Sequence, residues 1–175
     1  DTSAGNGYSL GISTTAGGAD SVDDFLWLGT DGFIYTADRN ALKPLLEYNP
    51  KGRTDLVPDG SVLSVSAAPG KHVLVYARAT TTGPAEVWAI NGGQRIRITH
   101  HNDDLLAKLA MNKPESVAVP VEGGVTMQMW ILKPPGFDDK KKWPVAYIVH
   151  GGPQVPFNDN WSFRWNASLW AAQGY

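Results

Sequence analysis

Short apolar stretches separated by turn residues run through the first two thirds of the chain. In residues 62–66 apolar and serine positions alternate, and apolar stretches follow at 72–77, 86–90 and 94–99, with Asn-Gly-Gly before the last of them. This spacing is typical of antiparallel strands joined by hairpins. The sequence therefore predicts four strands within residues 62–99, which is the size of one blade of a β-propeller.

An earlier part of the chain has a similar pattern. Residues 25–28 and 33–36 flank Gly-Thr-Asp-Gly, which predicts a hairpin in which Gly32 supplies the permissive backbone conformation. Residues 20–56 could form most of a preceding blade, although their second half is less regular. Blades close only as a ring of roughly 4–8, so these residues alone would leave sheet edges unpaired.

The pattern changes near residues 110–114, where we place a domain boundary. Strand candidates follow at 115–119, 125–132 and 144–149, and the first two flank Val-Glu-Gly-Gly as an antiparallel hairpin. The third contains Val145–Val149, which is continuously apolar, as expected of a strand covered on both faces in an α/β sheet. The expected fold is thus all-β at the start and α/β at the end.

A helix is expected near the carboxyl terminus, within residues 158–175. Asp159, Asn160 and Ser162 offer capping side chains, and Gly174 follows the apolar stretch as a helix-ending glycine does. The alternation of apolar residues before Gly174 would also fit a strand.

Composition narrows the classes of function. The chain has 15 basic and 17 acidic side chains, a net charge of −2 and no cysteine. This balance predicts neither a nucleic-acid partner nor a membrane partner, and no apolar run approaches the roughly 20 residues of a bilayer span. Disulfides and cysteine-based metal sites are excluded.

The two ends of the sequence indicate a piece of a longer chain. Asp1–Ser13 has neither the basic start nor the apolar core of a signal peptide, and the apolar stretch before Gly174 ends the sequence at Tyr175. We therefore expect the domains to be truncated at both ends.

The most distinctive candidate for chemistry is His150-Gly151-Gly152-Pro153, which we call the HGGP corner. Two glycines after a buried strand let the backbone turn N–H groups toward a ligand, and such donors stabilise the oxyanion of acyl transfer. In α/β-hydrolases an N–H from the loop after the third strand has this role. On residue types alone, a plain tight turn is an equal alternative.

No complete catalytic set is predicted beside the corner. We expect no G-x-S-x-G sequence anywhere in the chain, and hence no nucleophile elbow. The stretch His100–Asp104 has residue types that bind metals, but adjacent histidines rarely point the same way, so we predict no metal site. Asn160 and Asn166 both begin N-glycosylation sequons, which leaves a secretory origin open.

The order of these motifs resembles the junction of propeller and catalytic domain in the prolyl oligopeptidase family of serine peptidases. The resemblance rests on Ile98–Ser116, on Met129–Asp138 and on the stretches around the HGGP corner and before Tyr175. The similarity is greatest to the acylaminoacyl-peptidase-like branch, and within it to the secreted fungal dipeptidyl-peptidases of type V.

The resemblance implies a fold and an activity. Residues 1–112 would be the carboxyl-terminal part of a β-propeller, and residues 113–175 the amino-terminal part of an α/β-hydrolase catalytic domain. The whole protein would be a secreted serine exopeptidase that releases dipeptides from peptide amino termini, without cofactor or metal. Gly152 would give a backbone N–H to the oxyanion hole, Gly151 would shape the turn, and His150 and Pro153 would fix the loop. The catalytic Ser, Asp and His would lie beyond Tyr175.

Two alternatives remain at this stage. One is an acylaminoacyl-peptidase or an esterase on the same fold, since a fold does not determine a substrate. The other is a non-catalytic β-propeller binding module in which the HGGP corner is only a turn.

Overall fold

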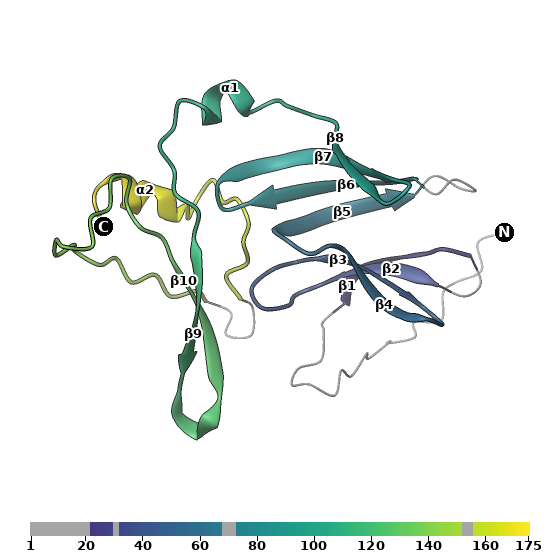
Figure 1. The fold of residues 1–175 in the computed structure, drawn as a ribbon, viewed down its shortest axis with the longest axis horizontal. Helices are drawn as coiled ribbons and strands as arrows, with labels where there is room; N and C mark the ends of the chain where they lie inside the picture. Colours follow the sequence, from purple (N-terminus) through teal and green to yellow (C-terminus); the bar gives the residue numbers. More distant parts are fainter. Residues whose placement is uncertain (1–21, 30–31, 68–72, 152–155) are drawn as a thin grey trace.

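A computed structural model describes residues 22–29, 32–67, 73–151 and 156–175 of the chain (Figure 1). Its amino-terminal part is a four-stranded antiparallel sheet in which each strand pairs with the next along the chain. The strands are β1 (Val22–Trp27), β2 (Phe33–Ala37), β3 (Leu45–Asn49) and β4 (Gly52–Val57).

A second sheet repeats this arrangement and confirms the four strands predicted within residues 62–99. The two-residue turn between its last strands has positive φ at Gly92 (57°) and Gly93 (80°), and Asn91 pairs with Gln94 across it. Glycine occupies such a turn without steric strain. The strands are β5 (Ser61–Ala67), β6 (Val73–Thr80), β7 (Gly83–Asn91) and β8 (Gln94–Arg97).

The less regular residues of the first sheet also form a hairpin, β3–β4. Its turn is held by a hydrogen bond from the Lys51 backbone N–H to Oδ1 of Asn49, at 2.9 Å. The expected role of Gly32 is wrong: the positive φ before β2 is at Gly29, at 90°. At Gly32 a Cβ would lie 3.1 Å from the Tyr48 carbonyl oxygen, so the residue is small because a neighbouring strand is close.

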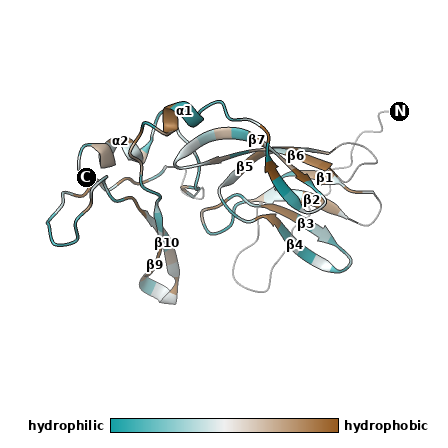
Figure 2. Cartoon of the chain, turned by 45° about the horizontal axis from the view of Figure 1, so that its top comes forward, coloured by the Kyte–Doolittle hydropathy of each residue, from teal (hydrophilic) through white to brown (hydrophobic). Residues whose placement is uncertain are grey.

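The two sheets stack on each other and share one hydrophobic core (Figures 1 and 2). In Figure 2 the strands of both sheets carry hydrophobic stretches. Backbone hydrogen bonds also join the sheets, from Lys43 N–H to the Gly60 carbonyl at 3.0 Å and from Val62 N–H to the Lys43 carbonyl at 2.8 Å. The sheets are therefore held as a pair. The core residues are Ile34, Leu45 and Val57 from the first sheet and Val62, Leu74, Tyr76 and Ile90 from the second.

The rest of the described chain has little regular structure. The predicted hairpin after residue 114 is confirmed, with Thr126 paired to Pro120 and Ile131 to Glu115. Neither α-helix in the described residues has the length and apolar character to cross a membrane. The elements are α1 (Asp103–Leu106), β9 (Glu115–Pro120), the 3-10 turn η1 (Glu122–Gly124), β10 (Thr126–Ile131) and α2 (Ala167–Ala172).

The prediction of a buried strand at Val145–Val149 is wrong for the chain as described. These residues form no strand, and Val145 and Val149 are 83% and 70% exposed. A strand needs a neighbour to satisfy its backbone N–H and C=O groups, and the described residues place none beside this segment. The four-stranded sheets are thus antiparallel and open, and the described residues form no α/β sheet.

The carboxyl-terminal helix forms but begins later than predicted. Its N-cap is Asn166, whose Oδ1 accepts a hydrogen bond from the Ser168 N–H at 2.9 Å. Ser162 instead closes a turn, accepting from the Trp165 N–H at 2.8 Å. Asp159 is bonded to the sheets, which removes it from any capping role. Gly174 ends the helix with a φ of 88°, as predicted.

Candidate functional site

The described part of the HGGP corner is open to solvent. His150 and Gly151 are exposed, while Gly152 and Pro153 lie outside the described residues. A Cβ built on Gly151 meets no atom within 4 Å, so space remains beside this backbone. Nδ1 of His150 lies 3.1 Å from the Gly151 carbonyl oxygen. The assignment of an oxyanion donor to Gly152 therefore stays a prediction.

An aromatic pair joins His150, the first residue of the corner, to Phe157, which lies beyond its last residue. The ring of His150 meets the ring of Phe157 edge-on, with centroids 5.8 Å apart and planes at 86°. The Phe157 carbonyl in turn accepts a hydrogen bond from the indole Nε1–H of Trp130, at 2.7 Å. Trp130 lies on β10, so this strand and the ring pair fix the position of Phe157 relative to His150.

The residues after Phe157 reach both four-stranded sheets. Nδ2 of Asn158 donates to Oδ1 of Asp38 at 2.6 Å, and Asp159 bonds to the β2–β3 loop of the first sheet and to residues of the second. Sequence reasoning missed these contacts, because it assigned Asp159 to a helix cap. The sequence gives no local signal for a bond between residues 78 positions apart.

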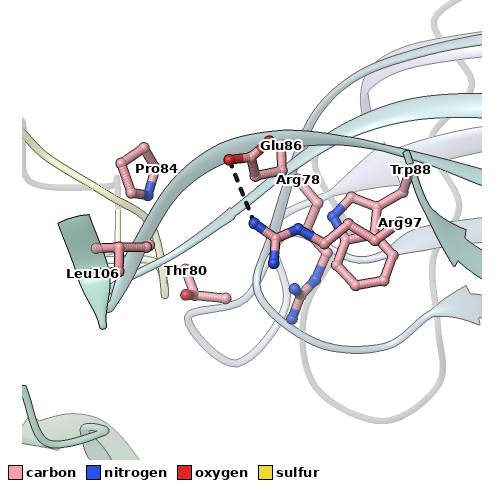
Figure 3. A pocket seen from close by; sticks show the side chains of 8 residues that line it. Arg78, Thr80, Pro84, Glu86, Trp88, Arg97 and Leu106 are labelled. Atoms are coloured by element: carbon pink, nitrogen blue, oxygen red, sulfur yellow. Dashed lines mark ion pairs between the residues drawn. The ribbon is translucent and has the colours of Figure 1, made fainter. Parts of the chain in front are cut away.

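A second candidate is a cavity of about 140 Å³ beside the ends of β6 and β7 (Figure 3). Its central group is the carboxylate of Glu86, whose side chain is 5% exposed. Arg97 Nη2 lies 3.4 Å from Glu86 Oε1, the ion pair drawn in Figure 3. Thr99 Oγ1 donates to the same carboxylate, as do the backbone and side-chain nitrogens of Asn102, at 3.2 and 3.1 Å. Sequence reasoning identified Glu86 only as a strand residue.

These donors lower the pKa of Glu86 to about 2. Burial acts in the opposite direction and is the largest single influence, but hydrogen bonds from Thr99, Asn102 and His101 together outweigh it. A carboxylate held so firmly in its charged form is a poor general base near neutral pH. Glu86 is therefore a structural anion.

Arg78 also lines a neighbouring cavity together with Asp59, Tyr76, Trp88 and Arg95, and the charged groups there are paired as well. Arg78 Nη2 bonds Asp59 Oδ2 at 2.6 Å, and its guanidinium lies 5.8 Å from the ring centre of Trp88. Arg95 pairs with Asp59 at 3.1 Å. Burial raises the pKa of the neighbouring Tyr76 hydroxyl, against the lowering effect of Arg95 and Arg78. The charged side chains that line the first cavity, Arg78, Glu86 and Arg97, are thus each paired with an opposite charge.

The stretch His100–Asp104 forms an ion-pair cluster. Nδ1 of His100 lies 2.8 Å from Oδ2 of Asp103, whose other oxygen bonds Arg97 at 2.5 Å. Hydrogen bonds from His100 and Arg97 lower the pKa of Asp103. The described residues contain no group of three or more His, Asp or Glu side chains arranged to hold a metal ion.

The two sequon asparagines differ in environment. Asn160 is exposed, whereas Asn166 is half-buried and caps α2 through its Oδ1. Oligosaccharide is attached through the side-chain nitrogen, so the cap itself does not block Asn166. Modification at either position stays a prediction.

The sequence does contain one G-x-S-x-G match, Gly7-Tyr8-Ser9-Leu10-Gly11, which the expectation of no nucleophile elbow overlooked. It lies outside the described residues. It also precedes the HGGP corner, whereas the resemblance places the nucleophile after the corner. An elbow needs a strand before the serine and a helix after it, and the match alone does not establish either.

The relatives of this chain include proteins named dipeptidyl-peptidase 5. The chain is 33% identical to dipeptidyl-peptidase 5 of Arthroderma otae over 165 residues, 89% of this chain and 22% of the relative. It is 52% identical to dipeptidyl-peptidase 5 of Trichophyton schoenleinii over 119 residues, 67% of this chain and 16% of the relative. The chain thus spans about a fifth of the length of these relatives. No family model matches it.

Solved structures share the fold. Pyrococcus horikoshii acylaminoacyl peptidase superimposes with a TM-score of 0.73 at 21% identity, over 89% of this chain and 24% of that one. Porphyromonas gingivalis dipeptidyl peptidase 4 gives 0.65 at 20% identity, over 91% of this chain and 24% of that one.

The relatives are named as peptidases, and solved peptidases share the stacked antiparallel sheets of this chain. Within that class the chain belongs to the prolyl oligopeptidase family, as its motifs indicated.

Proposed function

We propose that these residues are part of a serine exopeptidase that releases dipeptides from the amino termini of peptides. The observation that carries this proposal is the 52% identity over 119 residues with dipeptidyl-peptidase 5 of Trichophyton schoenleinii. The substrates are peptides, and the reaction requires neither a cofactor nor a metal.

In this proposal residues 1–112 contribute blades of a β-propeller. Two consecutive four-stranded meanders that stack through one core are the arrangement expected of neighbouring blades. Residues 113–175 begin an α/β-hydrolase domain. The exposed apolar side chains of Val145, Tyr147 and Val149 support this, because strand neighbours and helices of such a domain would cover them.

The HGGP corner has the role of half an oxyanion hole. When a serine oxygen attacks the scissile carbonyl, negative charge develops on the carbonyl oxygen, and the Gly152 N–H stabilises it. A donor of this kind contributes about 10²–10³ in rate. The exposed Gly151 leaves room for the peptide to approach the backbone.

The nucleophile, its histidine and its aspartate belong to the full-length protein beyond Tyr175. That protein is secreted and carries oligosaccharide at Asn160, which is exposed and begins a sequon.

Labelling with a fluorophosphonate, which reacts with activated serines, tests the proposal. The full-length protein should be labelled, and the 175-residue chain should not. Labelling of the short chain that Ser9→Ala removes would make Gly7–Gly11 the nucleophile elbow and overturn this assignment. Absence of labelling in the active full-length protein would reject the serine mechanism.

A further inference from the structure

The second cavity, next to the one that Glu86 borders, has a volume of about 190 Å³. Tyr76 belongs to the core that the two four-stranded sheets share, and Trp88 packs against that core. The cavity therefore lies on the face of the second sheet that meets the first. Its lining combines two aromatic rings, two guanidinium groups and one carboxylate, which belong to Tyr76, Trp88, Arg78, Arg95 and Asp59.

The hydroxyl of Tyr76 is an unsatisfied polar group at this cavity. Tyr76 is 2% exposed, and its hydroxyl oxygen has no hydrogen-bond partner among the described residues. Leaving a buried hydroxyl without a partner is costly, so the group is suited to a ligand that accepts its hydrogen bond. Burial raises its pKa above the ordinary value of 10.0, despite the opposing effect of Arg95 and Arg78. The hydroxyl is therefore protonated near neutral pH and is a donor.

The charges that line the cavity do not balance. One carboxylate, that of Asp59, is shared between two guanidinium groups. Its Oδ2 bonds Arg78 Nη2 at 2.6 Å, and its Oδ1 bonds Arg95 Nη1 at 3.1 Å. Each arginine is thus paired, but the lining keeps one positive charge in excess. A ligand with a single negative charge would neutralise it.

The two arginines differ in how far they are committed to the protein. The Arg78 side chain is 15% exposed, its Nε donates to the Asp59 carbonyl at 3.0 Å, and its guanidinium lies 5.8 Å from the ring centre of Trp88 (Figure 3). The Arg95 side chain is 43% exposed and bonds Asp59 through Nη1. A guanidinium has several N–H donors in a planar fork, so Arg95 retains donors for a second anion.

We propose that this cavity binds a carboxylate with a small apolar body, held by hydrogen bonds from the Arg95 guanidinium and the Tyr76 hydroxyl. A planar guanidinium matches the two oxygens of a carboxylate. The apolar body lies against the rings of Trp88 and Tyr76, and a cavity of about 150 Å³ is already enough for benzene. Free aromatic acids and the carboxyl groups of peptides share this chemistry. The inference does not rest on the peptidase activity proposed above.

The test measures binding of para-fluorobenzoate to the full-length protein by fluorine NMR, with para-fluorobenzyl alcohol as the neutral analogue. Tyr76→Phe removes only the hydroxyl, and Arg95→Gln removes the charge. Tyr48→Phe and Arg164→Gln, at exposed positions, are the matched controls. Thermal unfolding of each variant without ligand is measured alongside. Tyr76→Phe keeps the test decisive if Arg95→Gln does not fold.

We expect para-fluorobenzoate to bind with a Kd of about 0.1–1 mM, and the alcohol to bind at least about tenfold more weakly. Tyr76→Phe and Arg95→Gln should each weaken binding about tenfold, because each removes a hydrogen bond to a charged group. The two controls should bind as the wild type does. Without ligand, Tyr76→Phe should not lower the melting temperature, since the lost hydroxyl has no partner in the described part of the chain.

Competition identifies the source of the carboxylate. A short peptide with a free carboxyl terminus, the same peptide as a carboxamide, and inorganic phosphate are each added to the complex. Displacement by the free-carboxyl peptide alone supports a peptide carboxylate as the ligand, and displacement by neither peptide supports a free acid. Displacement by the carboxamide, or by phosphate more readily than by benzoate, overturns the carboxylate assignment.

Three further results would overturn the proposal. They are no binding of para-fluorobenzoate, equal binding of the acid and the alcohol, and wild-type affinity in Tyr76→Phe. A lower melting temperature of Tyr76→Phe without ligand would show that the hydroxyl has a structural partner, and would also overturn its role in binding.

Discussion

The carboxylate of Glu86 accepts hydrogen bonds from both the backbone and the side-chain nitrogen of Asn102, at 3.2 and 3.1 Å. Glu86 lies on β7, and Asn102 precedes α1, where the chain leaves the second sheet. The pair therefore fixes the path of the connection between the sheets and the β9–β10 hairpin. Because the carboxylate is buried, loss of its charge should lower the free energy of unfolding.

We expect Glu86→Gln to lower the free energy of unfolding by about 1–3 kcal/mol, because an amide nitrogen would face donors in place of an oxygen. The folded-state pKa of about 2 is below the ordinary value of 4.5, so the stabilisation is present above pH 4.5 and is lost as pH falls toward 2. Urea unfolding followed by tryptophan fluorescence at several pH values measures this. Glu122→Gln, at an exposed glutamate, is the control, and an equal effect at both positions would contradict the account.

Gly60 should tolerate substitution less well than Gly93. Both have positive φ, but a Cβ at Gly60 would lie 2.6 Å from the Ala79 carbonyl oxygen, while one at Gly93 meets nothing within 4 Å. We expect Gly93→Ala to cost about 1 kcal/mol from backbone strain alone and Gly60→Ala about 2–4 kcal/mol. Thermal unfolding of the two variants compares them, and a Gly60→Ala protein as stable as Gly93→Ala would be inconsistent with this packing.

Trp130→Phe should loosen the segment Phe157–Asp159, which follows the HGGP corner. The variant loses the 2.7 Å hydrogen bond to the Phe157 carbonyl but keeps an aromatic ring. We expect faster hydrogen exchange at the Asp159 amide, by about three- to tenfold. Trp143→Phe removes a similar 2.8 Å bond, to the Asp138 carbonyl within a local loop, and should leave that amide unchanged. The same response to both substitutions would show that the Trp130–Phe157 hydrogen bond does not specifically hold this segment.

Gly152→Pro and Gly152→Ala separate the N–H of the corner from its small size. Proline removes the donor and alanine retains it, so in the full-length protein we expect kcat to fall about 10²–10³ with proline and less with alanine. KM should change little in either variant. Equal losses of kcat in the two variants would show that the small size of Gly152, and not its N–H, is what matters.

The strands and hairpins of the two sheets could be predicted because the residues that specify each of them lie close together in the sequence. The Asn91–Gly93 turn and the alternation in β5–β8 specify pairing between neighbours in the sequence. The β3–β4 hairpin is harder to predict from sequence, because its turn is Pro50-Lys51 and its strands carry charged residues.

Elements that depend on distant partners were not predictable in this way. Val145–Val149 has a strand composition, yet the described residues give it no neighbouring strand. Asp159 has the residue type of a helix cap, but Thr81, Ser61 and Ala41 occupy its hydrogen-bonding groups instead. For the HGGP corner the chemistry stays a prediction, while the structure shows that Phe157 is held by Trp130 and packs against His150.

The most direct test of the central claim is the identity of the products that the full-length protein makes. Peptides with free amino termini and the same peptides with acetylated amino termini are incubated with the protein and analysed by mass spectrometry. We predict stepwise release of dipeptides from the free peptides, no cleavage of the acetylated ones, and inhibition by a fluorophosphonate. Release of single acetylated residues, or no cleavage of either set, would contradict the assignment as a serine dipeptidyl-peptidase.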